Sequence, residues 1–132
     1  MKDILVGIRN TFVSDATLSG AVTGMYFEQA PGGVDMPYIT YHLIGNVPTW
    51  DFGPVTYEQP VIQFNIYSDK LTSTSQICQI YSDLVLVYDD ATIIMDNHTH
   101  VMFQRGFSRL SKLGDEAVWL YTIDYASIFR EM

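Results

Sequence analysis

The stretch DNHTH, residues 96–100, holds the side chains of this sequence that are best suited to binding a metal ion. His98 and His100 would share one face of a strand, and Asp96 lies just before them. A structural zinc ion needs about four protein ligands and a catalytic one about three, and no Cys, His or Glu cluster elsewhere obviously completes the set. A polar hairpin turn accounts for the same residues, so we expect no metal and no cofactor.

Nucleophilic catalysis is also poorly supported by the sequence. The single cysteine, Cys78, lies in an apolar helical pattern without a basic residue at helical spacing, which predicts a buried, unreactive thiol. The serines within residues 69–75 are explained by the start of a helix, and no G-x-S-x-G elbow occurs. Adjacent carboxylates at 89–90 and 115–116 lie at expected turns, where acids are usually solvated. We therefore predict that the chain is not an enzyme.

Composition indicates one folded domain over residues 1–132, with 48% hydrophobic and 14% aromatic residues. A net charge of −8 argues against a surface that grips nucleic acid, and the only gathering of basic residues, between Arg105 and Lys112, is weak. No apolar run approaches the ~18 residues of a membrane span, and Ile4–Ile8 is too short for a signal-peptide core. With one cysteine no intrachain disulfide can form, so we expect a reducing compartment.

The order of elements predicts an α+β fold, with a mostly antiparallel sheet and two main helices packed on one face. Apolar residues at helical spacing predict helices over 3–13 and 73–88, with a short capped turn of helix near 14–22 between them. Alternating or continuous apolar runs predict strands over 25–29, 37–46, 61–69, 93–95, 100–110 and 118–129.

The stretch MPYITYHLIGN, residues 36–46, is apolar on both faces of its predicted strand. An antiparallel sheet in a small domain usually keeps one face wet, so two apolar faces predict that both are covered, one of them by something other than the helices. Alternation places Ile39, Tyr41 and Leu43 on one face and Tyr38, Thr40, His42 and Ile44 on the other.

A long interruption, residues 45–59, follows this strand and carries Trp50, Phe52 and Tyr57. It exceeds the ~2 to 5 residues of a tight hairpin, so we expect an ordered excursion or a pair of strands that extends beyond the body. Three exposed rings would lower solubility unless another surface covers them. The aromatic residues therefore predict contact with a partner.

This succession of elements resembles the tail-completion, or tail terminator, proteins of long-tailed bacteriophages and prophages. The resemblance covers nearly the whole chain and rests on hydrophobicity and spacing. Its most telling parts are Ala30-Pro31, the entry Pro37-Tyr38-Ile39 with Tyr41, and the strand 61–69 that leads into a helix opening with TSTSQI.

The resemblance implies a structural virion protein, assembled in the host cytoplasm, that forms a ring, commonly a hexamer. Its implied partners are further copies of itself, the tail tube protein and the head-completion connector, with DNA only in transit through an acidic channel and no membrane. The long hairpin would bring its aromatic residues to subunit or tube contacts. The interface residues expected from the sequence and the resemblance together are Trp50, Phe52, Tyr57, Tyr38, His42 and Ile44.

Two alternatives remain open from the sequence. A head-tail connector, or neck protein, would share the ring but bind the portal side. A small metal-dependent α+β enzyme or binding domain would use the DNHTH stretch instead.

Overall fold

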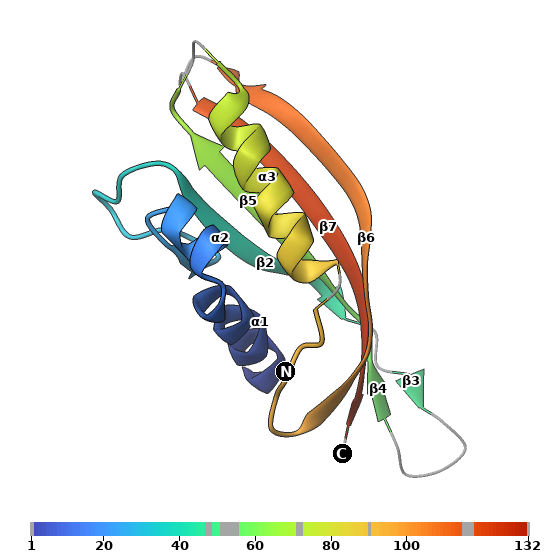
Figure 1. The fold of residues 1–132 in the computed structure, drawn as a ribbon. Helices are drawn as coiled ribbons and strands as arrows, with labels where there is room; N and C mark the ends of the chain where they lie inside the picture. The colour runs from blue at the N-terminus through green and yellow to red at the C-terminus, as the bar shows by residue number, and fades with distance from the viewer. Residues whose placement is uncertain are drawn as a thin grey trace.

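The computed structural model describes residues 2–46, 49–50, 56–70, 73–89, 91–114 and 118–131, with only the backbone described for residues 49 and 50. Within these residues the chain forms three helices and one seven-stranded sheet (Figure 1). The helices are α1 (Lys2–Ser14), α2 (Ala16–Ala21) and α3 (Ser75–Tyr88). The strands are β1 (Met25–Phe27), β2 (Tyr38–Asn46), β3 (Thr49–Trp50), β4 (Thr56–Glu58), β5 (Pro60–Ser68), β6 (His98–Leu113) and β7 (Val118–Glu131).

The sheet is antiparallel except at one edge, where β1 runs parallel to β2. Strand β7 is central: β5 and β4 pair in succession along one of its sides, and β6 pairs along the other. β3 and β4 continue the β2–β5 pair as an extended hairpin beyond the body of the sheet (Figure 1). The predicted α+β fold with its long hairpin is confirmed.

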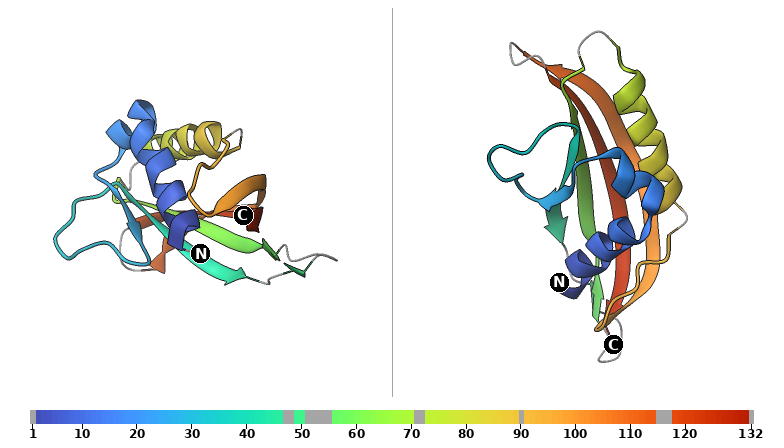
Figure 2. Two further views of the ribbon diagram at one scale, coloured as in Figure 1. Left: turned by 90° about the horizontal axis from the view of Figure 1, so that it is seen from below. Right: turned by 60° about the vertical axis from the view of Figure 1, so that its left-hand side comes forward.

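All three helices cover the same face of the sheet, as the two views of Figure 2 make clear. Apolar side chains at helical spacing explain why: α1 buries Ile4, Ile8 and Phe12, and α3 buries Ile77, Ile80 and Leu84. The inner face of the sheet contributes alternate residues of three strands to this core, namely Ile39, Tyr41, Ile62, Phe64, Ile66, Ile123 and Tyr125.

Hydrogen bonds tie the helices to one another and to the edge of the sheet. Asp15 caps α2, because its Oδ1 accepts from the Leu18 N–H at 2.8 Å. The buried Tyr88 hydroxyl donates to the Ile8 carbonyl at 2.8 Å and so joins α3 to α1. None of the helices in the described ranges is long and apolar enough to cross a membrane.

One predicted strand is wrong. Residues Ile93 to Met95 form no strand, although their apolar character favoured one. The Ile93 N–H donates to Nδ1 of His100 at 3.3 Å rather than to a neighbouring strand, and the segment packs closely against Gly7 of α1. Here the need to cover the helix decides the backbone path, so the final part of the described chain has two long strands in place of the three expected.

Candidate assembly surface

The face of the sheet turned away from the helices, called here the open face, carries two of the expected interface residues. Tyr38 and His42 alternate with the buried Ile39 and Tyr41 on β2, so they point away from the core, and both side chains are half-buried. Because Figure 2 shows no layer of helix over this side, the open face is the surface that the sequence predicted would need a cover from outside the helix layer.

Three tyrosines form a row across the open face. Tyr38 lies between Tyr26 of β1 and Tyr67 of β5. The centroid of its ring is 6.4 Å from that of Tyr26 and 5.0 Å from that of Tyr67. Partial burial raises the pKa of Tyr38, and the neighbouring Tyr67 adds to the rise, so the hydroxyl stays protonated as a hydrogen-bond donor. Half-buried tyrosines with an apolar ring and a polar end are enriched at protein interfaces.

A ladder of polar side chains crosses the open face beside the tyrosines. Asn65 donates to Gln63 Oε1 at 3.1 Å, Gln63 donates to Asp124 at 3.0 Å, and Thr122 donates to Asn65 Oδ1 at 2.8 Å. Thr40 and His42 are 2.9 Å apart through Oγ1 and Nε2. These groups satisfy part of one another's hydrogen-bonding capacity, and a protein that covers them would have to offer donors to the Asp124 carboxylate.

The remaining expected interface residues lie on or near the extended hairpin. Ile44 is 55% exposed at a bulge of β2, where the register shifts between Leu43 and Gly45. Tyr57 is half-buried in β4, opposite Arg130 of β7. Trp50 lies in β3 opposite Thr56, with its backbone alone described, and Phe52 lies outside the described residues.

The long strand β6 offers a second surface for a partner. Among the described residues it pairs only with β7, so its outer edge presents unpaired backbone groups. Val101 and Phe107 on this strand are 51% and 60% exposed. Edge strands of this length are normally covered or blunted, and pairing with another chain is one way to cover them.

The residues of the DNHTH stretch do not converge on one point. His98 Nδ1 lies 2.8 Å from Asp3 Oδ2, His100 accepts from the Ile93 N–H, and Asp96 is exposed. The structure instead brings Glu58 of β4 and Glu131 of β7 beside His98, with one ligand atom from each within 4.8 Å of the others. No sequence pattern pointed to this cluster, because its members are separated by at least 33 positions and meet only through strand register.

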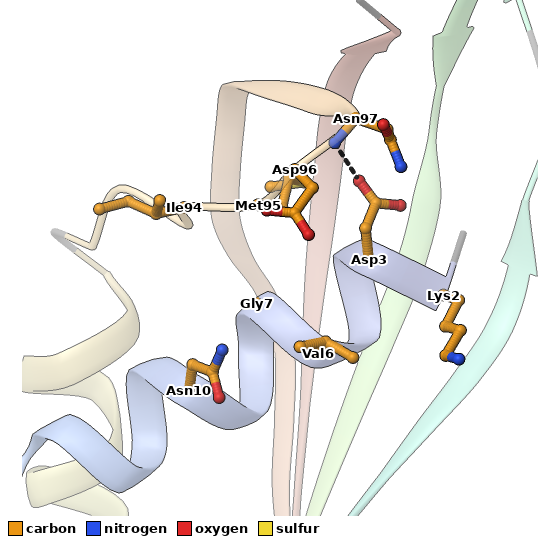
Figure 3. Close-up of a pocket in the computed structure, with 9 residues that line it drawn as sticks. All are labelled: Lys2, Asp3, Val6, Gly7, Asn10, Ile94, Met95, Asp96 and Asn97. Carbon is orange, nitrogen blue, oxygen red and sulfur yellow. Dashed lines mark hydrogen bonds between the residues drawn. The ribbon is translucent and has the colours of Figure 1, made fainter.

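A groove of about 530 Å³ runs between the exposed side of α1 and residues 94–97, as Figure 3 shows. Asp3 lies at its end, where its carboxylate accepts from the Asn97 N–H at 3.1 Å. Burial raises the pKa of Asp3, but the hydrogen bonds from His98 and Asn97 and the charge of His98 outweigh it and leave the pKa below its usual value. Among the described residues that line the groove, the titratable ones are Lys2, Asp3 and Asp96.

Arg105, the first of the three basic residues that gather in the sequence, is paired with residues of α3 and its end. Arg105 lies 3.3 Å from Asp89 and donates to the Tyr81 hydroxyl at 2.7 Å. Its charge is therefore directed to α3 and its C-terminal end.

Comparison with known proteins identifies the fold. No protein-family model and no curated protein matches the chain. A solved structure described as "Virion of native gene transfer agent (GTA) particle" superposes with a TM-score of 0.81 at 11% identity, covering 92% of this chain and 90% of that chain. A second solved structure has a TM-score of 0.52 at 11% identity, covering 100% of this chain and 96% of the other. The chain therefore shares its fold, over almost its whole length, with a chain found in a phage-like virion particle.

Proposed function

We propose that this protein is a non-enzymatic structural subunit of a phage-type virion, and more specifically a tail terminator. In this role it forms a ring, of six subunits by the resemblance of its sequence, that ends the tail tube and meets the head-completion connector. Its shared fold with a chain of a gene transfer agent virion supports the virion assignment. The resemblance of residues 30–31, 37–41 and 61–69 to tail terminators supports the finer one.

The observation that carries the proposal is the one-sided covering of the sheet. The helices occupy one face (Figure 2), while the open face carries the tyrosine row and a ladder of hydrogen-bonded polar side chains. A neighbouring subunit that covers this face, with a donor for the Asp124 carboxylate, would bury its aromatic surface. A closed ring would also cover the outer edge of β6, since ring closure leaves no subunit at an open end.

The acidic charge of the chain suits the inner wall of such a ring. At a net charge of −8 per subunit, a hexamer carries a large negative charge that repels the DNA backbone. DNA could then pass through the channel without adhering to it. The partners in this proposal are further copies of the chain, the tail tube protein and the head-completion connector, and the localisation is the virion tail.

The proposal is tested by the mass of the particle in solution. Untagged protein is analysed by native mass spectrometry and analytical ultracentrifugation over a wide range of concentration, alone and with tail tube protein. We expect a ring-sized species whose proportion rises with concentration. A strict monomer under all these conditions would contradict the ring.

A matched pair of variants tests the surface itself. Ile44→Asp places a charge beside the open face, whereas Leu86→Asp places one on the outer side of α3, where Leu86 is 73% exposed. Ile44→Asp loses about half of the transfer free energy of an isoleucine and buries a carboxylate in the interface. It should therefore weaken the association of each pair of subunits by roughly tenfold or more. Leu86→Asp should assemble as the wild type does, and equal effects of the two substitutions would rule out this side of the sheet as the interface.

A neck connector is the second candidate, since the same covering of the sheet suits any ring in the virion. The two are separated by the partner that copurifies: tail tube subunits support the terminator, and portal or adaptor subunits support the connector.

A further inference from the structure

Three strands and one helix end bring four titratable side chains together at the base of the extended hairpin. His98 opposes Glu131 across the β6–β7 pair, and Glu58 opposes Phe129 across the β4–β7 pair. Since paired residues share a face and Phe129 is a core residue, Glu58, His98 and Glu131 all point to the helix side. Asp3 reaches the same place from the first turn of α1.

His98 has the features of a metal ligand held by a carboxylate. Its side chain is 7% exposed, and its Nδ1 lies 2.8 Å from Asp3 Oδ2. Because an ionised carboxylate only accepts, Nδ1 carries a proton, and Nε2 is the ring nitrogen whose lone pair a metal ion would take. Nε2 is buried and has no hydrogen-bond partner in the described part of the chain. Buried polar atoms are rarely left unpaired, so Nε2 points to a missing ligand.

The distances fit donors arranged around a common ion. A ring nitrogen of His98 and one oxygen each of Glu58 and Glu131 lie within 4.8 Å of one another, yet no hydrogen bond joins Nε2 to either carboxylate. Ligands ~2.1 Å from a tetrahedral ion lie about 3.4 Å apart, so small side-chain rotations would close the set. Two neighbouring carboxylates also repel each other when both are ionised, and a bound cation removes that repulsion.

We propose that Glu58, His98 and Glu131 bind one divalent transition-metal ion, with Asp3 as the carboxylate that orients His98. A neutral imidazole with two carboxylates suits Zn²⁺ or a similar first-row ion better than Mg²⁺, which prefers oxygen ligands. A histidine ligand that passes its other ring N–H to a carboxylate is the usual arrangement in such sites. Water or a partner's side chain would complete the coordination.

The bound ion would fasten the extended hairpin to the body of the subunit. It would join β4, at the root of the hairpin, to the start of β6 and the end of β7, and through Asp3 to α1. The hairpin would then be held in one orientation before any partner arrives. Because this consequence concerns the single chain, the proposal does not depend on the place of the protein in a virion.

The test uses the full, untagged chain, stripped with a chelator and titrated with Zn²⁺ by calorimetry. We expect one ion per chain and a higher unfolding temperature in its presence. Glu131→Gln removes an exposed ligand with little effect on packing and should weaken Zn²⁺ binding at least tenfold. The matched control is Glu28→Gln, since Glu28 also contacts a histidine, His42 at 3.3 Å, but lies outside the cluster. Asp3→Asn should weaken binding by about 10- to 100-fold.

A second measurement, by nuclear magnetic resonance, locates the bound ion. Histidine ring resonances in ¹H–¹⁵N spectra should show that Zn²⁺ shifts His98 Nε2 and leaves His100 unchanged. Fewer than one ion per chain, equal affinities of Glu131→Gln and Glu28→Gln, or Mg²⁺ binding as tight as Zn²⁺ binding would each overturn the proposal.

Discussion

Replacing Tyr88 by phenylalanine should lower stability at neutral pH and raise it in alkali. The Tyr88 side chain is fully buried at the end of α3, and its hydroxyl donates to the Ile8 carbonyl of α1 at 2.8 Å. Ile8 lies inside α1, so its carbonyl also accepts a helical hydrogen bond and is not orphaned by the substitution. The loss should therefore be close to that of one ordinary hydrogen bond, about 1 kcal/mol at pH 7.

The effect of Tyr88→Phe on stability changes sign at high pH, because Tyr88 keeps its proton in the folded state. Burial raises its pKa far above the ordinary value, and the nearby Tyr41 and Asp15 add to the rise. A raised folded pKa gives stability that is complete below pH ~10 and is lost as pH rises further, since only the unfolded chain releases the proton. Each pH unit above ~10 then costs the wild type about 1.4 kcal/mol that Tyr88→Phe does not lose. The two stability curves should cross near pH ~10.6, where this cost equals the ~1 kcal/mol of the hydrogen bond.

Urea unfolding followed by circular dichroism, at fixed low protein concentration between pH 7 and 11, measures both effects. Ile77→Val is the matched control, because it costs a similar ~0.5 to 1.5 kcal/mol in the same core without removing a titratable group. Its curve should stay parallel to that of the wild type. If Tyr88→Phe were also parallel to the wild type up to pH 11, the argument from burial of the hydroxyl would be refuted.

Three further predictions concern the helical layer. Gly7→Ala should destabilise by about 1 to 3 kcal/mol despite the better helix propensity of alanine, because a Cβ there would lie 2.8 Å from the Ile94 carbonyl oxygen and 2.9 Å from Ile93 Cγ2. At Gly20 in α2 an added Cβ meets nothing within 4 Å, so Gly20→Ala should stabilise the protein by about 0.5 to 1 kcal/mol. If thermal unfolding ranked Gly7→Ala and Gly20→Ala alike, the close packing of α1 on the 93–95 segment would be contradicted. Asp15→Ala should cost about 0.5 to 2 kcal/mol in urea unfolding through loss of the hydrogen bond from the Leu18 N–H, whereas Asp15→Asn should keep most of it.

The elements that sequence reasoning placed correctly are those fixed by local periodicity. Helical spacing of apolar residues located α1 and α3. Alternation around Tyr38 predicted a sheet with a second face that the helices do not cover. These features depend on neighbours a few residues apart, which is the range over which a sequence pattern carries information.

What the sequence could not determine depends on segments that meet only after folding. Residues 93–95 have the apolar character of a strand, yet they cover Gly7 of α1 instead of joining the sheet. Asp3 contacts His98, which lies 95 positions away in the sequence, and strand register brings Glu58 and Glu131 to the same point. A shift of one residue in register would turn any of these side chains to the opposite face. The sequence thus determined the helices and most of the strands, whereas tertiary packing alone decided which distant side chains lie together.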